Sequence, residues 1–436
     1  MAVASLEDIV APNLIRDTFP YVRVPVARFD SDEPGLAPPA ERWVTDTTFR
    51  DGQQAREPYT VEQIVRIYEL LHQLDGGAGL IRQSEFFLYT EKDRAAVEAV
   101  QALGHRYPEV TSWIRAVATD FELVKAAGVR ETGILTSCSD YHIFKKLGWT
   151  RTEALRFYLQ IVDAALEAGV VPRCHFEDLT RADVHGFAVP FAQALMERAH
   201  QARVPIKIRL CDTMGVALPW AAAALPRGVP KLVRAFVEEA GVPPAQLEWH
   251  GHNDLFKVHA NSVAAWLYGC AAINATLLST GERTGNSPLE AAVVEHVGMT
   301  GEERVDLRVL TEIGRYMRDE CGVPVPPSYP LLGSEFNVTR AGIHADGLLK
   351  DEEIYNVFDT RKLLGRPVGV GVNDKSGAAG VAFWLSQRLG ERVEKSDPGV
   401  HAMYRNIQRL YDAGRVSALT QDELVALARE HFPGRF

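Results

Sequence analysis

The sequence is poor in cysteine, in long apolar runs and in net positive charge. Its five cysteines are scattered among 436 residues and none forms a C-x-x-C pair, which excludes a zinc ribbon and predicts reduced thiols. No stretch approaches the ~18 consecutive apolar residues of a membrane helix, and the N-terminus lacks the apolar centre of a secretory signal. The net charge of −10 provides no basic surface for nucleic acid. These absences predict a soluble, cytoplasmic protein that binds small molecules, without a nucleic-acid or membrane partner.

Short β-like runs alternate with amphipathic helical segments through the first three quarters of the chain. A closed (β/α)8 barrel requires eight such strands over about 250 residues. An open doubly wound sheet is the alternative, but its G-x-G-x-x-G fingerprint after the first strand is absent. We therefore predict an α/β fold, a TIM barrel. The predicted strands are Arg42–Thr47, Gly79–Phe87, Val110–Arg115, Glu131–Thr136, Val170–Phe176, Pro205–Cys211, Gln246–His252 and Ala271–Leu278.

Three regions are expected along the chain. Residues 1–40 form an N-terminal arm that ends in a Pro-rich acidic run, 41–305 form the barrel, and 306–436 form a linker and C-terminal subdomains of mixed, largely helical structure. Residues 333–380 are polar and Gly-rich, but they lack the complete G-x-x-x-x-G-K-[ST] pattern, so a phosphate loop is not predicted.

His250 and His252 stand at the end of the seventh predicted strand, with Gly251 between them. Side chains at i and i+2 of a strand point to the same face, so both imidazoles can bind one metal ion. A bare H-x-H is more often an ordinary histidine pair. In a barrel, however, Asp51 after the first strand converges on the same rim, which completes a two-His-one-carboxylate site with open positions.

Three separated motifs resemble one family. They are Asp46-Thr47-Thr48-Phe49-Arg50-Asp51-Gly52-Gln53-Gln54, His250-Gly251-His252-Asn253-Asp254 and Gly281-Glu282-Arg283-Thr284-Gly285-Asn286. Their order and content are similar to those of the isopropylmalate/homocitrate synthase family of metal-dependent, aldolase-type TIM barrels. The resemblance implies an acyltransferase that condenses acetyl-CoA with a 2-oxo acid and then hydrolyses the thioester to release CoA.

The resemblance also implies roles for individual residues. Asp51, His250 and His252 match metal ligands and Asn286 matches a further ligand or near-ligand; Arg50, Gln54, Glu177 and Thr213 match groups beside the 2-oxo acid. Residues 342–347 are similar to a segment that family members lend to the partner subunit, so His344 and Tyr355 become acid/base candidates across a domain-swapped homodimer.

The expected chemistry agrees with these residue types. A divalent cation (Mn, Mg, Zn or Co) polarises the keto group of a 2-oxo acid as a Lewis acid, and Arg50 steadies the same oxygens. A base must take a proton from the thioester methyl group. The sequence leaves open whether Glu177 or His344 is that base.

Cationic residues narrow the predicted substrate. Arg173 stands where homocitrate synthases carry an arginine near the distal carboxylate, Arg82 replaces a common glutamate, and His175 replaces a small serine, which shortens the pocket. With Arg115, these residues are predicted to bind a short 2-oxo acid with an anionic group near C4. Oxaloacetate fits, as in Re-type citrate synthases, and phosphonopyruvate or phosphinopyruvate fits equally, as in phosphonomethylmalate and phosphinomethylmalate synthases. Structural salt bridges with a carboxylate such as Glu85 are the alternative for Arg82 and Arg173.

Other activities remain as alternatives. A homocitrate or isopropylmalate synthase has the same motifs, and a lyase can use the same barrel. Lyases of the hydroxymethylglutaryl-CoA type carry a cysteine after the eighth strand, whereas this chain has Ser279-Thr280-Gly281-Glu282-Arg283 there, which favours synthesis. A non-catalytic binding barrel is the third alternative. Because the chain ends at Phe436, we expect no leucine-type regulatory domain.

Overall fold

The computed structural model describes residues 4–21 and 25–436. Contacts divide the chain into two compact units, Met1–Asp306 and Leu307–Phe436. No helix in the described ranges is long and apolar enough to span a bilayer.

The first unit is a closed parallel barrel. Each strand pairs with its successor, and β1 pairs with β8 through the register Trp43↔Ala272 to Asp46↔Ala275, which closes the sheet. The prediction of a TIM barrel is therefore confirmed. The strands are β1 (Trp43–Asp46), β2 (Ile81–Phe86), β3 (Glu109–Ile114), β4 (Glu131–Ser137), β5 (Val171–Glu177), β6 (Lys207–Asp212), β7 (Leu247–Gly251) and β8 (Ala272–Thr276), and the two-residue β9 (Ser287–Pro288) pairs with β8.

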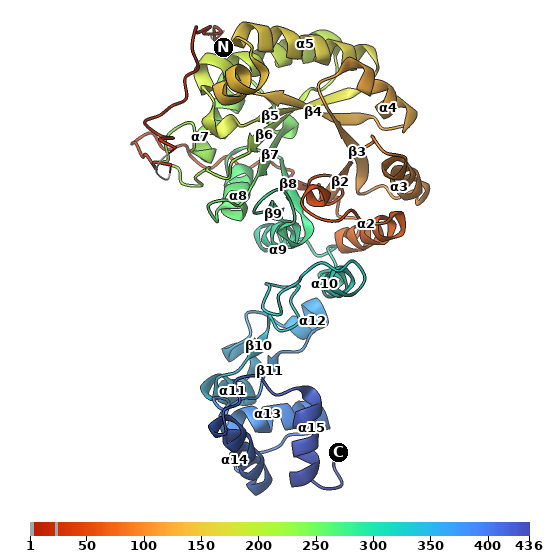
Figure 1. The fold of residues 1–436 in the computed structure, drawn as a ribbon, viewed down its shortest axis with the longest axis vertical. Coiled ribbons are helices and arrows are strands. Elements are labelled where there is room, and N and C mark those ends of the chain that lie inside the picture. The colour runs from red at the N-terminus through yellow and green to blue at the C-terminus, as the bar shows by residue number, and fades with distance from the viewer. Residues whose placement is uncertain (1–3, 22–24) are drawn as a thin grey trace. The chain divides into compact units, whose positions relative to one another are not determined.

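Helices surround this barrel (Figure 1). Several of them begin at a threonine that caps the helix reciprocally with the residue three positions on, as Thr60 does with Gln63 and Thr150 with Glu153; such boxes satisfy two unpaired backbone donors. The helices are α1 (Asp51–Gln54), α2 (Val61–Asp75), α3 (Glu91–Ala102), α4 (Phe121–Ala126), α5 (Arg151–Glu167), α6 (Val189–Ala202), α7 (Val229–Arg234), α8 (Val258–Tyr268) and α9 (Leu289–Thr300).

The barrel interior below its mouth contains charges rather than the branched apolar side chains that usually fill such barrels. Glu85 of β2 accepts from Arg173 of β5 at 2.6 Å and from Arg209 of β6 at 2.9 Å, and Arg209 also pairs with Glu248 of β7 at 2.9 Å. All four are at most 3% exposed. Burial raises the pKa of Glu85, but the three arginines Arg209, Arg50 and Arg173 outweigh it and hold that pKa well below its usual value. The network is therefore a set of ionised, mutually neutralising groups.

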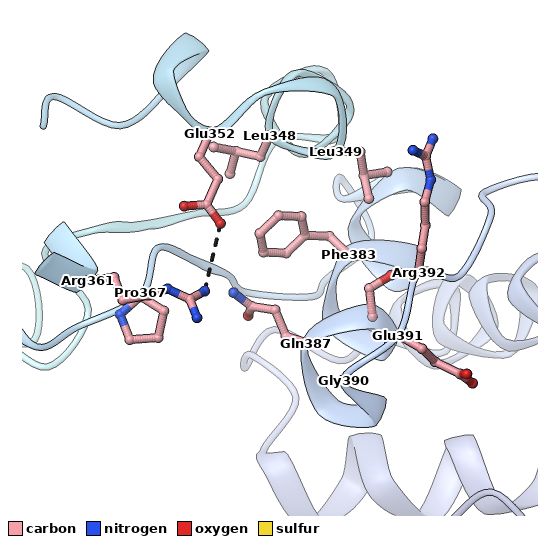
Figure 2. Close-up of a pocket in the computed structure, with 11 residues that line it drawn as sticks. Leu348, Leu349, Glu352, Arg361, Pro367, Phe383, Gln387, Gly390, Glu391 and Arg392 are labelled. Atoms are coloured by element: carbon pink, nitrogen blue, oxygen red, sulfur yellow. Dashed lines mark ion pairs between the residues drawn. The ribbon is translucent and has the colours of Figure 1, made fainter. Parts of the chain in front are cut away.

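The second unit is mostly helical. It consists of α10 (Val309–Asp319), α11 (Gly342–Lys350), α12 (Thr360–Leu364), α13 (Gly377–Leu389), α14 (Pro398–Asp412) and α15 (Gln421–His431), with a two-stranded sheet of β10 (Val338–Thr339) and β11 (Gly369–Val370). α13 packs against α11 and α14 through buried residues such as Phe383 and Leu385. A cavity of about 530 Å³ lies beside α11 and α13, with Leu348 and Phe383 among the residues that line it (Figure 2).

Two segments differ from the expectation. No helix was predicted within the polar, Gly-rich region 333–380, yet this region contains α11, in which Ala345 and Leu348 are buried. Tertiary burial outweighs the low helix propensity of its glycines. The π-helix Tyr141–Leu147 after β4 was also not predicted, because its wider turn has no 3.6-residue signature.

Candidate metal centre and active-site cavity

The two histidines of H-x-H and Asp51 meet at the mouth of the barrel. Asp51 is the first residue of α1, the helix that follows β1, and His250 lies in β7. His252 follows β7 and forms an isolated backbone β-bridge with Asn286. The Nε2 atoms of the histidines are 3.2 Å apart, and they lie 3.6 and 3.9 Å from Asp51 Oδ2. Among the described residues, these three form the one His/Cys/Asp/Glu cluster with ligand atoms within 4.8 Å of one another.

The donor set fits a divalent cation. His250 Nδ1 lies 2.7 Å from the Oδ1 atom of Asn274, whose amide nitrogen is directed at the Thr45 carbonyl. Nδ1 therefore carries the proton and Nε2 presents its lone pair to His252 and Asp51. Two imidazole nitrogens 3.2 Å apart match the separation of neighbouring ligands on one ion with bonds of about 2.1 Å.

Burial keeps these groups in the protonation states that metal ligation needs. Burial and the neighbouring His252 lower the pKa of His250 to about 3, so the imidazole is neutral. Burial raises the pKa of Asp51, but Arg50 and the two histidines lower it more, and the net shift is downward. A carboxylate and two neutral imidazoles are suitable ligands for Mn, Mg, Zn or Co.

Asn286 supports the carboxylate. Its amide nitrogen donates to Asp51 Oδ2 at 2.9 Å and lies 3.3 Å from the Gly251 carbonyl oxygen. Its Oδ1 atom faces Gly281, where a Cβ atom would lie only 1.8 Å away. Asn286 therefore orients the Asp51 carboxylate, and the glycine at 281 makes its own close approach to Asn286 possible.

Arg50 is held beside the metal-ligand set by a buried carboxylate. Its Nε donates to Glu85 Oε1 at 2.7 Å, and Nη1 lies 3.5 Å from Asp51 Oδ1. Thr47 donates to the same Glu85 oxygen at 3.1 Å. The interior charge network therefore reaches the cavity through Glu85 and fixes the guanidinium there.

A cavity of about 350 Å³ opens over these groups. Gln54, His175, Glu177 and Thr213, predicted to bind or act on the substrate, all line it. So do Trp113, Leu135, Cys211, Glu282 and Arg283, for which no role was predicted. The barrel therefore assembles polar groups from several strand ends around the metal-ligand set, as the fold requires.

Glu177 is held as a carboxylate. Its side chain accepts from Ser137 at 2.6 Å and from Lys146 at 3.1 Å, and His142 Nδ1 lies 3.0 Å away. Burial raises the pKa of Glu177, but the His142 hydrogen bond and charge, with Ser137 and Lys146, lower it to about 2. Such a carboxylate is a weak base at neutral pH.

Three arginines predicted to bind substrate do not line this cavity. Arg82 pairs with Glu41 at 3.0 Å and stacks on the Trp43 ring. Its place near the start of β2 puts it at the end of the barrel opposite the active-site mouth. Arg115 pairs with Asp120 at 3.2 Å.

Arg173 faces the interior one layer below His175 on β5, where it pairs with Glu85 and, at 2.9 Å, with Glu131. Arg82 and Arg173 both form the kind of salt bridge given as their structural alternative, although Arg82 pairs with Glu41 rather than Glu85. The two-residue period of a strand predicts that the Arg173 side chain faces inward. It does not predict how far the cavity extends into the barrel.

His344 and Tyr355 belong to the second unit. Their rings are 4.2 Å apart between centroids, and Thr339 Oγ1 lies 2.9 Å from His344 Nδ1. Tyr355 is 43% exposed, and the nearby Ile343 and Val357 are 74% and 86% exposed. The pair is thus preassembled on an exposed face of its own unit.

Sequence reasoning named Glu85 only as a partner of Arg82 or Arg173, and it named no role for Asn274 or His142. Each of these three residues holds another residue of the site in place. Glu85, Asn274 and His142 hold Arg50, His250 and Glu177, respectively. Glu85 and Asn274 face inward from β2 and β8, so the two-residue period of those strands was the available signal. His142 lies on the π-helix and had none.

The chain is similar to several synthases along most of its length. It is 52% identical to citrate (Re)-synthase of Syntrophus aciditrophicus, covering 99% of this chain and 69% of that protein, and 48% identical to citrate (Re)-synthase of Clostridium kluyveri, covering 98% and 96%. It is 40% identical to 2-phosphinomethylmalate synthase of Streptomyces hygroscopicus, covering 97% of each.

A solved structure supports the fold. Hydroxymethylglutaryl-CoA lyase of Pseudomonas aeruginosa superposes with a TM-score of 0.52 at 18% identity, covering 66% of this chain and 95% of that one. The model of the HMGL-like family matches residues 42–317, which include the barrel strands and the candidate metal ligands Asp51, His250 and His252. This protein therefore belongs to the HMGL-like family, among the isopropylmalate/homocitrate synthases.

Proposed function

We propose that this protein condenses acetyl-CoA with oxaloacetate in a metal-dependent Claisen-type reaction and releases CoA by thioester hydrolysis, as a citrate synthase of the Re type. The observation that carries the proposal is the Asp51–His250–His252 set beside Arg50 in one cavity. It provides ligands for a cation and a fixed guanidinium where a 2-oxo acid would be polarised.

The relatives support the choice of oxo acid. The two that are 52% and 48% identical are citrate (Re)-synthases, whereas the 2-phosphinomethylmalate synthase is 40% identical. Phosphinopyruvate is therefore the second candidate. With Arg173 committed to the interior network, Arg50 and Arg283 are the arginines that line the cavity and face an anionic substrate.

The side chains have distinct roles in this proposal. A bound divalent cation would supply Lewis-acid polarisation of the keto group. Arg50, fixed by Glu85, stabilises the oxygen on which negative charge develops. Glu177 is ionised, because its pKa is about 2, and its carboxylate orients the substrate.

The proton of the thioester methyl group passes instead to His344. The imidazole of His344 acts as the base, assisted by Tyr355, whose ring centroid lies 4.2 Å from that of His344.

We also propose that His344 and Tyr355 serve the partner's barrel in a homodimer. Their preassembled pair lies beside the exposed apolar side chains Ile343, Ile354 and Val357, which a partner surface would cover. An exposed tyrosine and a half-buried histidine on an apolar face are suited to completing a site in another subunit.

CoA release tests the activity. The purified protein, with Mn²⁺ and acetyl-CoA, should release CoA fastest with oxaloacetate among oxaloacetate, phosphinopyruvate, 2-oxoglutarate, 2-oxoisovalerate and pyruvate. Release without preference for a dianionic acid would contradict the substrate assignment, and no release with any acid would contradict the function.

Subunit mixing tests the exchange of His344. Asp51→Ala and His344→Ala are each expected to be inactive. After denaturation and co-refolding, a swapped dimer recovers about a quarter of wild-type activity, because half the dimers contain one intact site of two. No recovery, with heterodimers demonstrated by a tag, would contradict the exchange.

A further inference from the structure

The imidazole of His175 occupies a notch in the barrel wall that only glycine leaves open. An ideal Cβ atom at Gly133 would lie 2.4 Å from His175 Nε2, 2.8 Å from Cε1 and 3.1 Å from Trp113 Cδ1. These separations are shorter than real Cβ contacts, and the atoms met are ring atoms rather than the end of a flexible chain. Any other residue at 133 would therefore displace the His175 ring.

The strand register explains why these residues meet. Gly133 pairs with Trp113 of β3 and with Arg173 of β5, while His175 pairs with Leu135 of β4. Leu135, Trp113 and His175 all line the cavity, and residue 133 faces the same way as Leu135 because strand side chains alternate. The His175 ring thus leans across β4 one layer below Leu135.

The ring is held by shape rather than by a hydrogen bond. His175 is 3% exposed, and its Nε2 has no hydrogen-bond partner among the described residues. Its nearest carboxylate oxygen, Glu85 Oε2, is 3.8 Å away, beyond hydrogen-bond distance. Burial, with Arg209, lowers the pKa of His175 well below its usual value, which agrees with a neutral ring seated among cations.

We propose that Gly133 and His175 act as one specificity element: the notch at Gly133 seats the His175 ring across the cavity floor, and the ring limits the 2-oxo acid to four carbons. The inference rests on the proposed function, because it concerns the substrate of the same site. Gly133 is a positioning residue that acts through His175, and a larger residue at 133 moves the ring into the substrate's space.

A double-mutant cycle tests the coupling. The proteins are wild type, Gly133→Ala, His175→Ala and the double variant, with Gly298→Ala as the control because a Cβ atom there meets nothing within 4 Å. The activity readout is kcat/KM for oxaloacetate and for 2-oxoglutarate, measured as the rate of CoA release in the presence of Mn²⁺. The structural readout is Tm, which needs no substrate.

His175→Ala should raise the ratio of kcat/KM for 2-oxoglutarate over oxaloacetate by about 10-fold or more, the usual value of one methylene in a pocket. Gly133→Ala should lower kcat/KM for oxaloacetate by roughly 10-fold or more through the displaced ring, and lower Tm by roughly 2–10 °C. In the His175→Ala background, Gly133→Ala should lower kcat/KM for oxaloacetate by less than about 3-fold and should lower Tm less than it does alone. The two shortest contacts, both with the His175 ring, are gone there, and only the 3.1 Å contact with Trp113 Cδ1 remains.

Two results would overturn the inference. An unchanged substrate ratio in His175→Ala would remove the ring as a length limit, and additive effects of the two changes would remove the coupling. If Gly133→Ala does not fold, the double variant must fold and must match His175→Ala in kcat/KM and Tm. A double variant that also fails to fold would refute the claim that Gly133 acts through the His175 ring. Absence of turnover by the wild type with every oxo acid contradicts the proposed function instead, while the Tm cycle still reports the coupling.

Discussion

Replacing Asn274 by alanine should weaken metal binding although Asn274 is not itself a ligand. Asn274 Oδ1 accepts the Nδ1 proton of His250 at 2.7 Å, and both side chains are buried. Without this acceptor, His250 loses the contact that fixes its tautomer and ring orientation. Removing such a partner usually costs 10- to 100-fold in metal affinity, equivalent to ~1.4–2.7 kcal/mol.

Calorimetric titration with Mn²⁺ at pH 7 measures this loss directly. Asn274→Asp keeps an acceptor for His250 and should bind Mn²⁺ within about 3-fold of wild type. Asn261→Ala is the control for lost stability, because Asn261 is equally buried but donates to the Ala217 carbonyl at 3.3 Å, outside the metal-ligand set. Both alanine variants should lose about 1–3 kcal/mol of folding stability, but only Asn274→Ala should lose affinity. Equal Mn²⁺ affinity in Asn274→Ala and wild type would refute the role assigned to Asn274.

His252→Ala should abolish Mn²⁺ binding and CoA release together, and calorimetry showing unchanged affinity would remove His252 from the ligand set. Arg173→Ala should lower the free energy of unfolding by about 3–5 kcal/mol, because it leaves Glu85 and Glu131 buried with fewer partners; a Tm equal to wild type would contradict this account. Glu177→Gln tests the pH dependence. The folded pKa of about 2 lies below the usual 4.5, so ionised Glu177 contributes up to ~3 kcal/mol above pH 4.5 that is lost as pH falls towards 2. The Tm difference between wild type and Glu177→Gln should therefore shrink between pH 6 and 3, and a constant difference would contradict the assigned environment.

The barrel and the convergence of Asp51, His250 and His252 could be predicted because they depend on local pattern. Strand and helix periods are properties of neighbouring residues, and closure follows from eight alternating units. His250 and His252 share a face through the two-residue period of a strand, and Asp51 joins them because barrel strands end at one rim.

The inward-facing arginines show what the alternation of strand side chains could not predict. Alternation places Arg173 inside, but it cannot say that the interior layer there contains Glu85, Glu131 and Glu248, which bind it. A charge inside a barrel therefore has the same signature whether it meets substrate or other side chains. Only the register of strands far apart in sequence separates the two.

The sequence by itself determined the eight-stranded architecture and the residue types that meet in the candidate metal centre, because both follow from short-range periodicity and residue chemistry. Only the tertiary structure decided which charges reach the cavity, which carboxylate fixes Arg50, and that Gly133 makes room for His175. These depend on ångström-scale distances between separate strands, and closure of the barrel sets those distances.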